Sequence, residues 1–308
     1  PPKIFILSVI FLSNIGGAGT LIGDPPNILI GSQVPGLTFG SFIQYLTFPV
    51  VASIAALFLL WKWTKRDIIK SRNDNFSWLF ASNLMLEDLK RQERSLRIPK
   101  SITIRSVGVF SLVLVGFFSH SITHMEPAVI ALLGATIMLA VFHRELNLHH
   151  LFAKVEWPTL LFFSGLFVVV GAMEEVGLLE ILAHQLTTIT DNLWILMMVV
   201  LFASAILSAI VDNIPFVAVM IPVLKELLSS DIFMNHPKAG LLWWALALGA
   251  CFGGNGSLIG ASANVVTVAI AESKGIKIGF KEFAKDSVPV TAMTIFISAG
   301  YLTVLYFW

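Results

Sequence analysis

The sequence predicts an all-α polytopic membrane protein, because its composition, its long apolar runs and the positions of its tryptophans agree. Hydrophobic residues make up 56% of the 308 residues, charged residues make up 13%, and the mean hydropathy is +0.84. Charged residues alone approach about a quarter of an ordinary soluble domain. The composition therefore favours a chain that lies in lipid.

Long apolar runs supply the expected membrane crossings. Runs of roughly 17 to 25 residues are long enough to cross a ~30 Å hydrocarbon core. They lie at about 49–64, 105–121, 127–142, 158–176, 193–211, 240–252 and 289–308. Several are slightly short, which favours broken or re-entrant segments. Tryptophan rings prefer the headgroup level, and five of them lie at the ends of these runs: Trp61, Trp63, Trp157, Trp194 and Trp308.

The most polar stretch of the chain, 62–105, separates two of these crossings. It holds eleven of the twenty Lys and Arg residues against five acids. The positive-inside bias therefore predicts that this basic loop is cytoplasmic. Its middle, 77–97, has apolar residues near helical spacing, so it is either a short amphipathic helix on the membrane surface or a solvated linker. Because the net charge is only +1 and the positive residues collect in this loop, no nucleic-acid partner is expected.

From the basic loop the chain is expected to cross outward at 105–121, inward at 127–142 and outward again at 158–176. The segment 178–192 contains no Lys or Arg, which fits the outer side of the membrane. These crossings make up three helices in sequence.

The apolar stretch 193–230 is interrupted near its centre by Asp212-Asn213-Ile214-Pro215. A proline breaks a membrane helix, and an Asp is costly in lipid. Irregular backbone is tolerated at membrane depth where it lines protein or a cavity. The sequence therefore predicts a re-entrant hairpin whose polar tip is buried at mid-depth.

A glycine-rich string occurs twice at a constant offset of 237 residues. Residues 16–27 read GGAGTLIGDPPN and residues 253–264 read GGNGSLIGASAN, with seven of twelve positions identical and a hydroxyl kept where Thr20 pairs with Ser257. Small residues let membrane helices pack closely. Closely spaced glycines followed by an acid and two prolines instead unwind a helix. We expect a discontinuous helix at each copy, with backbone groups, hydroxyls and asparagines around a small ion or anion.

The charges that follow the two copies differ. The stretch 31–48 has no Lys or Arg, whereas 273–288 contains four lysines. Each stretch leads into a terminal helix, which we expect to begin at Pro49 and at Pro289. The positive-inside bias then predicts that the two copies lie upside down relative to each other, as in inverted-repeat transporters with a central site.

Three strings carry a resemblance to a known family: SNIGGAGTLIGDPPNILIGS at 13–32, SAIVDNIPFVAVMIPVL at 208–224 and ALALGACFGGNGSLIGASANVV at 245–266. With them the chain resembles the ion-transporter superfamily. It is most similar to the citrate-transporter-like branch that holds the melanosomal P protein, arsenite permeases and NhaD-type sodium/proton antiporters. Within this branch the three strings are most similar to the P-protein-like group. The resemblance implies secondary transport by two inverted repeats, often through an elevator-like motion. Each repeat would have a re-entrant hairpin followed by a broken helix.

On this basis residues 1–64 are the end of a first inverted repeat, with a broken helix and a terminal helix, and residues 65–104 are a cytoplasmic basic linker. Residues 105–308 are the second repeat, with three helices, a hairpin at 193–230, a broken helix at 240–274 and a terminal helix at 289–308. The chain opens on Pro1-Pro2-Lys3 without an initiator Met or a signal peptide. We therefore expect it to be N-terminally truncated, without the hairpin of the first repeat.

The resemblance also implies a binding site shared between the repeats. One half would comprise Asn14, Gly16, Gly17, Thr20, Gly23, Asp24 and Asn27. The other would comprise Asp212, Asn213, Asn255, Gly256, Ser257, Ser262 and Asn264. Within that second half, the expected sodium ligands are Asp212, Asn213, Asn255 and Ser257.

Asp24 in the first copy is replaced by Ala261 in the second. Intramembrane carboxylates usually mark ion or proton pathways, so Asp24 and Asp212 are candidates for a group that alternates between a proton and a cation. In that case Asp212→Asn abolishes the pH dependence of transport. The alternative is that each carboxylate caps the half-helix that follows it. The single cysteine, Cys251, is expected only to pack, because a lone buried cysteine behaves as a small hydrophobe.

Two functions fit these features. The first is a secondary active transporter of a small ion or anion, coupled to sodium or protons, and the second is a passive anion channel of P-protein type. No Lys or Arg lies in the motifs, so a multiply charged anion would need co-bound cations. An enzyme is not supported, since no nucleophile and base pair, metal-ligand cluster or phosphate loop is found, and no cofactor is expected.

The expected partners are the lipid bilayer, a small ion or anion, a sodium or proton coupling ion and a second copy in a homodimer. The expected location is multi-pass in a plasma or inner membrane, or in an organelle membrane of a eukaryote.

Overall fold

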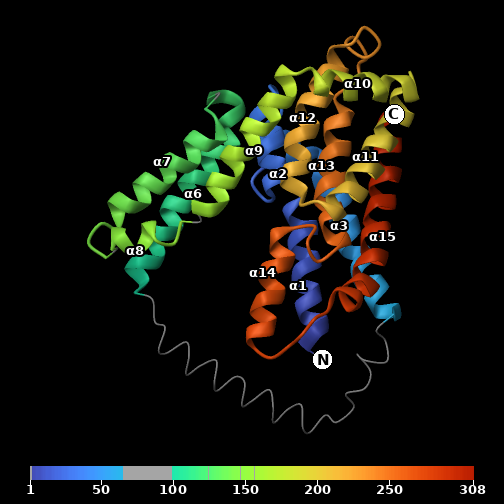
Figure 1. The fold of residues 1–308 in the computed structure, drawn as a ribbon. Coiled ribbons are helices and arrows are strands. Elements are labelled where there is room, and N and C mark those ends of the chain that lie inside the picture. Colours follow the sequence, from blue (N-terminus) through green and yellow to red (C-terminus); the bar gives the residue numbers. More distant parts are fainter. Residues whose placement is uncertain (1, 65–98, 124, 146, 156) are drawn as a thin grey trace. The chain divides into compact units, whose positions relative to one another are not determined.

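The computed structural model describes residues 2–64, 99–123, 125–145, 147–155 and 157–308. Helices make up most of these residues and none of them forms a strand, so the predicted all-α class is confirmed. The chain divides into two compact units, residues 1–57 with 156–308 and residues 58–155 (Figure 1). The amphipathic helix expected at 77–97 lies outside the described residues.

The first unit begins with an interrupted helix. Helix α1 spans Pro2–Gly17, the helix is lost over residues 18–24, and α2 spans Pro25–Gln33. Two prolines open α2, where a missing backbone N–H costs nothing because the first amides of a helix have no partner within it. Helix α3, Phe39–Thr64, follows after a short turn.

The middle of the first unit contains α9 (Trp157–Glu175), α10 (Leu178–Ile189) and a helical hairpin. The hairpin consists of α11, Leu193–Ile210, and α12, Asn213–Ser229, which fold back on each other (Figure 1). Asn192 begins α11 by accepting hydrogen bonds from the backbone N–H groups of Trp194 and Ile195, as an N-cap residue does.

The last part of the first unit is a second interrupted helix and a long helix. Helix α13, Leu241–Gly253, passes through the short 3₁₀ turn Gly254–Gly256 before α14 begins, at Ser262–Ser273, and α15 spans Phe280–Phe307. Every residue of α13 is buried, so the core of this unit forms around it. Helices α11, α12 and α15 pack against it.

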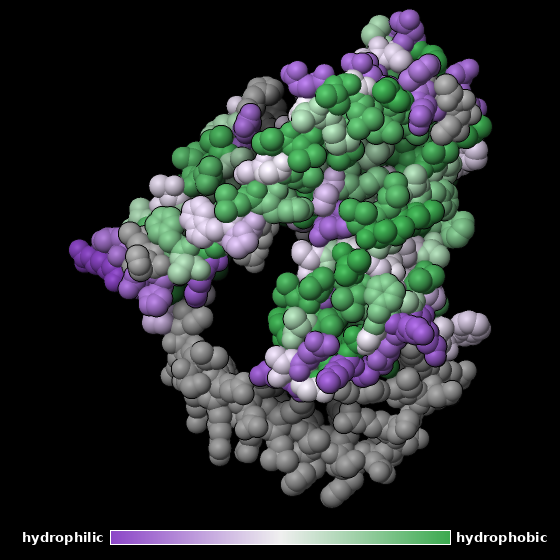
Figure 2. Space-filling view, viewed as in Figure 1, coloured by the Kyte–Doolittle hydropathy of each residue, from purple (hydrophilic) through white to green (hydrophobic). Residues whose placement is uncertain are grey.

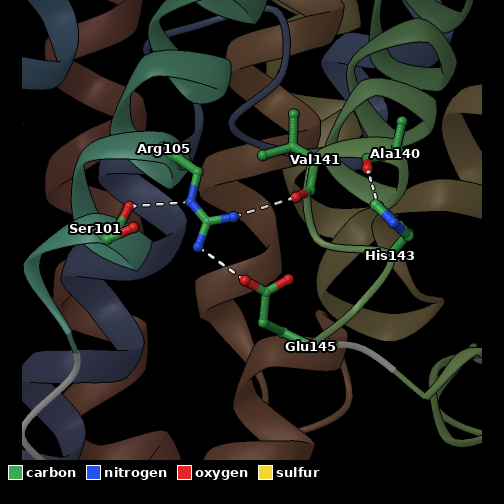
Figure 3. A network of polar contacts seen from close by, with 6 residues as sticks. All are labelled: Ser101, Arg105, Ala140, Val141, His143 and Glu145. Carbon is green, nitrogen blue, oxygen red and sulfur yellow. Dashed lines mark hydrogen bonds and ion pairs between the residues drawn. The ribbon is translucent and has the colours of Figure 1, made fainter.

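The second unit contains α6, Lys100–Thr123, α7, Pro127–Val141, and the short α8, Leu148–Phe152. Helices α6 and α7 pack against each other, and Arg105 joins their ends (Figure 3). Its guanidinium donates to the Val141 carbonyl at 3.3 Å and to the Glu145 carboxylate at 2.8 Å. The hydrogen bond from Arg105 lowers the pKa of the Glu145 carboxyl below its ordinary value.

Four helices in the described part of the chain are long and apolar enough to cross a membrane: Phe39–Thr64, Lys100–Ser119, Leu193–Ile210 and Phe280–Phe307. In Figure 2, apolar residues cover most of the visible face of the first unit and polar residues gather at its two ends. A small polar group interrupts the apolar surface at about mid-height. A surface with this pattern fits lipid contact around a polar interior.

One feature differs from the sequence prediction. The terminal helices begin before the prolines that were expected to start them, so Pro49 lies inside α3 and Pro289 lies inside α15. Proline is tolerated inside membrane helices because neighbouring groups compensate for the lost hydrogen bond. The segment 178–192, expected on the outer side of the membrane, contains helix α10. Leu179 and Ala183 lie four residues apart on its buried face, while Ile181 stays exposed.

Candidate functional site

The two interrupted helices run in opposite directions through the first unit. Helix α1 lies beside α14, and α2 lies beside α13, so the first half of each interrupted helix accompanies the second half of the other (Figure 1). The two breaks, residues 18–24 and 254–261, therefore come together. The tip of the α11–α12 hairpin packs onto the second break.

The same close backbone contact closes both breaks. A Cβ atom added to Gly17 would lie 2.8 Å from the carbonyl oxygen of Gly23, and one added to Gly23 would overlap the carbonyl oxygen of Gly17. In the second copy, a Cβ on Gly260 would lie 2.8 Å from the carbonyl oxygen of Gly254. Only glycine lets the two ends of each break approach this closely, which explains why these positions are repeated in the sequence.

The repeated asparagines hold the same breaks closed through hydrogen bonds from their side chains. Asn27 Nδ2 donates to the carbonyl oxygens of Ala18 and Thr20, both at 2.9 Å. Asn264 Nδ2 donates to those of Gly254 and Ser257, both at 2.8 Å. Both asparagines are fully buried. Each therefore supplies a donor to buried carbonyls of its own break, of which those of Thr20 and Ser257 also accept a backbone N–H at 3.3 Å, from Gly23 and Gly260.

Asn14 links the two copies. Its Nδ2 donates to Asn264 Oδ1 at 2.8 Å and to Asn255 Oδ1 at 2.9 Å. The orientation of these amides follows from the backbone: the Asn264 nitrogen faces two carbonyl oxygens, so its oxygen must face Asn14, and Asn14 must present its nitrogen. Asn255 then presents its own oxygen to Asn14. Its Nδ2 is buried and has no hydrogen-bond partner in the described structure.

The hairpin tip joins both breaks. Asn213 Nδ2 lies 3.5 Å from Asp24 Oδ2 in the first break. On the other side, Ser257 in the second break donates its hydroxyl to the Ala209 carbonyl, and Ser208 donates to the Ala250 carbonyl at 2.7 Å. Three segments that are far apart in the sequence thus share one polar cluster in the interior of the unit.

The two candidate carboxylates are used differently. Asp212 Oδ1 accepts the backbone N–H of Ile214 at 3.1 Å, so Asp212 caps α12. Asp24 occupies the corresponding position before α2 but makes no side-chain capping hydrogen bond. Pro26 removes one of the two amides that a capping side chain uses, and the other, the N–H of Asn27, donates to the Asp24 backbone carbonyl at 3.0 Å. The Asp24 carboxylate is left to contact the hairpin tip.

Most of the predicted site residues lie around this cluster. Three of them are exposed: Gly16, Gly23 and Ser262. The four expected sodium ligands each have another contact in the described structure: Asp212 caps α12, Asn213 contacts Asp24, Asn255 accepts from Asn14, and Ser257 donates to a carbonyl.

One residue of the cluster was not predicted. Cys251 was expected only to pack, but its buried thiol donates to Asn27 Oδ1, with sulfur and oxygen 3.6 Å apart. The signal was present in the sequence, because an offset of 237 residues aligns Cys251 with Asn14.

Comparison with known proteins places the chain in a family. A family model described as "Citrate transporter" matches residues 1–249. The chain belongs to the citrate transporter family. The match includes the first break and ends just before the second one.

Relatives of this citrate transporter family member extend over nearly the whole chain. An uncharacterized transporter of Mycobacterium bovis is 38% identical over 309 residues, which cover 98% of this chain and 67% of the relative. The 46 kDa membrane protein of Mycobacterium leprae is 38% identical, with the same coverage of both chains. The P protein of Sus scrofa is 33% identical over 99% of this chain and 44% of its own length. The chain is thus a membrane transporter of the citrate transporter family.

Proposed function

We propose that this chain belongs to a secondary active transporter that moves a small ion or anion coupled to sodium or protons. The observation that carries the proposal is the meeting of two helix breaks with a hairpin tip in an apolar unit, where Asp24 and Asp212 lie half-buried. Ionisable residues at membrane depth are costly and usually mark the path of an ion or proton. Broken helices at such a place supply backbone groups and helix ends that contact an ion.

Asp24 is the better placed of the two carboxylates to carry a coupling proton or cation. The Asp212 carboxylate is held by the backbone N–H of Ile214, whereas the Asp24 carboxylate caps no helix and meets the hairpin tip through Asn213. A cation that enters the cluster would be neutralised by these acids, and Asn213, Asn255 and Ser257 would offer oxygen atoms to it. Sodium prefers such oxygen ligands, as other hard cations do.

No Lys or Arg lies in either break or at the hairpin tip. A multiply charged anion therefore has no fixed positive partner in the cluster, and it would need co-bound cations to offset its charge. Coupling to sodium or protons meets this requirement. The Nδ2 of Asn255, which has no partner among the described residues, is a hydrogen-bond donor that suits an oxygen of such an anion.

Flux measurements in proteoliposomes of the intact protein test the proposal. Gradients of sodium, protons, chloride, citrate and arsenite are imposed one at a time, and uptake of each solute is followed. Uphill movement of one solute driven by the gradient of another is the expected result. Flux that only ever runs downhill would contradict the proposal and would indicate the passive anion channel.

We also propose that the basic loop 62–105 faces the cytoplasm, because it concentrates the positive charge of the chain. Single cysteines introduced into this loop in a Cys251→Ser background are expected to resist membrane-impermeant thiol reagents in intact cells. Labelling from outside the cell would reverse the assignment.

A further inference from the structure

The repeat extends beyond the glycine strings to two hydrogen-bond donors. Cys251 in the last turn of α13 stands 237 positions after Asn14 in the last turn of α1, and Asn264 stands the same distance after Asn27. Asn14 donates to the side-chain oxygen of Asn264, and Cys251 donates to that of Asn27. Each interrupted helix thus donates, from the equivalent position, to the asparagine that closes the other break.

Both receiving oxygens depend on these donors. The nitrogen of each asparagine is already committed to two carbonyl groups of its own break, so the amide plane is fixed and the oxygen points to the other copy. All four side chains are buried: Asn14 is 5% exposed and Asn27, Cys251 and Asn264 are fully covered. Water therefore does not replace a lost donor, and an unpaired buried acceptor costs stability.

We propose that Asn14 and Cys251 are positioning residues that hold the two breaks against each other and so fix the geometry of the transport site. The pair of hydrogen bonds, Asn14 to Asn264 and Cys251 to Asn27, is called the break clasp. This inference rests on the proposed function for its role in transport, but the clasp itself is a property of the fold.

The break clasp is stronger on one side than on the other. The amide of Asn14 is a good donor at 2.8 Å, and it also holds Asn255. A thiol is a weak donor, and the Cys251 sulfur lies 3.6 Å from its acceptor. The same thiol lies beside the Asp24 carboxylate. The first break, which carries Asp24, is therefore the one held by the weaker donor.

Hydrogen exchange of the intact protein tests the clasp with two variants of Cys251. Serine and alanine differ only by the hydroxyl, and both are smaller than cysteine, so a difference between them reports the donor and not the lost volume. Cys251→Ala is expected to raise amide exchange in residues 18–27 about threefold to tenfold, the effect of one net hydrogen bond. Cys251→Ser is expected to stay within about twofold of the unaltered protein. Equal exchange in the two variants would overturn the clasp.

The flux assay separates positioning from folding. In Cys251→Ala the KM for the solute found in the gradient scan is expected to rise about threefold to tenfold while the maximal rate changes by less than about twofold, and Cys251→Ser is expected to restore the KM. An unchanged KM in Cys251→Ala would remove the positioning role. Ser204→Ala is the matched control, because this hydroxyl in α11 is also buried but has no partner in the described structure.

The two proposals fail in different ways. If no driven flux is found for the unaltered protein, the proposed function fails, and the exchange measurement still decides whether the break clasp exists. If flux is driven but serine and alanine behave alike in both assays, the clasp fails and the proposed function stands.

Discussion

Gly23→Ala is the sharpest test of how the first break is built. The added Cβ would overlap the Gly17 carbonyl oxygen and lie 2.8 Å from Thr20 Oγ1. The Gly17 oxygen belongs to the backbone of a segment that Asn27 holds through two hydrogen bonds, so it has little freedom to move. Extra atoms forced into such packing cost about 1–3 kcal/mol, and the contact with backbone favours the upper end, about 3 kcal/mol.

Gly16→Ala is the matched control. A Cβ at Gly16 meets nothing within 4 Å, and the residue lies within α1. Alanine is favoured over glycine inside a helix by about 0.5–1 kcal/mol, so this variant should be neutral or slightly stabilising. The two neighbouring substitutions should therefore differ in free energy of unfolding by about 3–4 kcal/mol.

Thermal unfolding of the detergent-purified protein measures the difference. At about 2–4 °C per kcal/mol, Gly23→Ala should unfold at least about 6 °C below Gly16→Ala. Gly260→Ala in the second break should behave like Gly23→Ala, because its Cβ would lie 2.8 Å from the Gly254 oxygen and 3.1 Å from the Ser208 oxygen. The reasoning is refuted if Gly23→Ala and Gly16→Ala unfold together.

Three further predictions concern hydrogen bonds. Asn27→Leu and Asn264→Leu should each destabilise the protein by about 1–3 kcal/mol, because each removes the side-chain donor of a buried carbonyl, that of Ala18 or of Gly254. Denaturant unfolding should show similar losses for both. Asp212→Asn should change the free energy of unfolding by less than about 0.5 kcal/mol, whereas Asp212→Ala should lower it by about 1 kcal/mol, since asparagine caps a helix as well as aspartate does. If Asp24 is the coupling group, flux in Asp212→Asn keeps its pH dependence and flux in Asp24→Asn loses it. Arg105→Gln should raise the pKa of Glu145 towards its ordinary value, because the Arg105 hydrogen bond is the main cause that lowers it; carboxyl NMR measures the shift. The lowered pKa means that the ion pair stabilises the folded state at neutral pH, and this contribution is lost as the pH falls through the pKa of Glu145.

The crossings and the breaks followed from local sequence signals. Apolar runs of membrane length gave α6, α7, α9 and α11 to within a few residues, and the glycines and prolines correctly marked where helix is lost. The sequence did not predict the starts of α3 and α15. Their first turns mix polar and apolar residues, and a proline usually marks the start of a helix. A helix continues past such a proline when it lies in a membrane, which no local pattern reveals.

The site itself was predictable in residue type but not in pairing. The repeated asparagines were expected to face an ion directly, yet the side-chain nitrogens of Asn27 and Asn264 donate hydrogen bonds to the carbonyls of their own breaks. Such closures depend on how an unwound segment folds back on itself. The contact of Cys251 with Asn27 joins residues 224 positions apart, and the choice of Asp212 over Asp24 as a cap depends on which amides the prolines remove.

Pro49 and Pro289 have a consequence for motion. Each lies about ten residues inside a long terminal helix, and a proline leaves the carbonyl four residues earlier without its usual intrahelical donor. Helices bend most readily where the ladder is already open. Helices α3 and α15 therefore each contain a hinge, at Pro49 and at Pro289, where bending breaks no hydrogen bond to the proline nitrogen. The two longest helices of this unit can each bend at a defined residue and need not move as rigid rods.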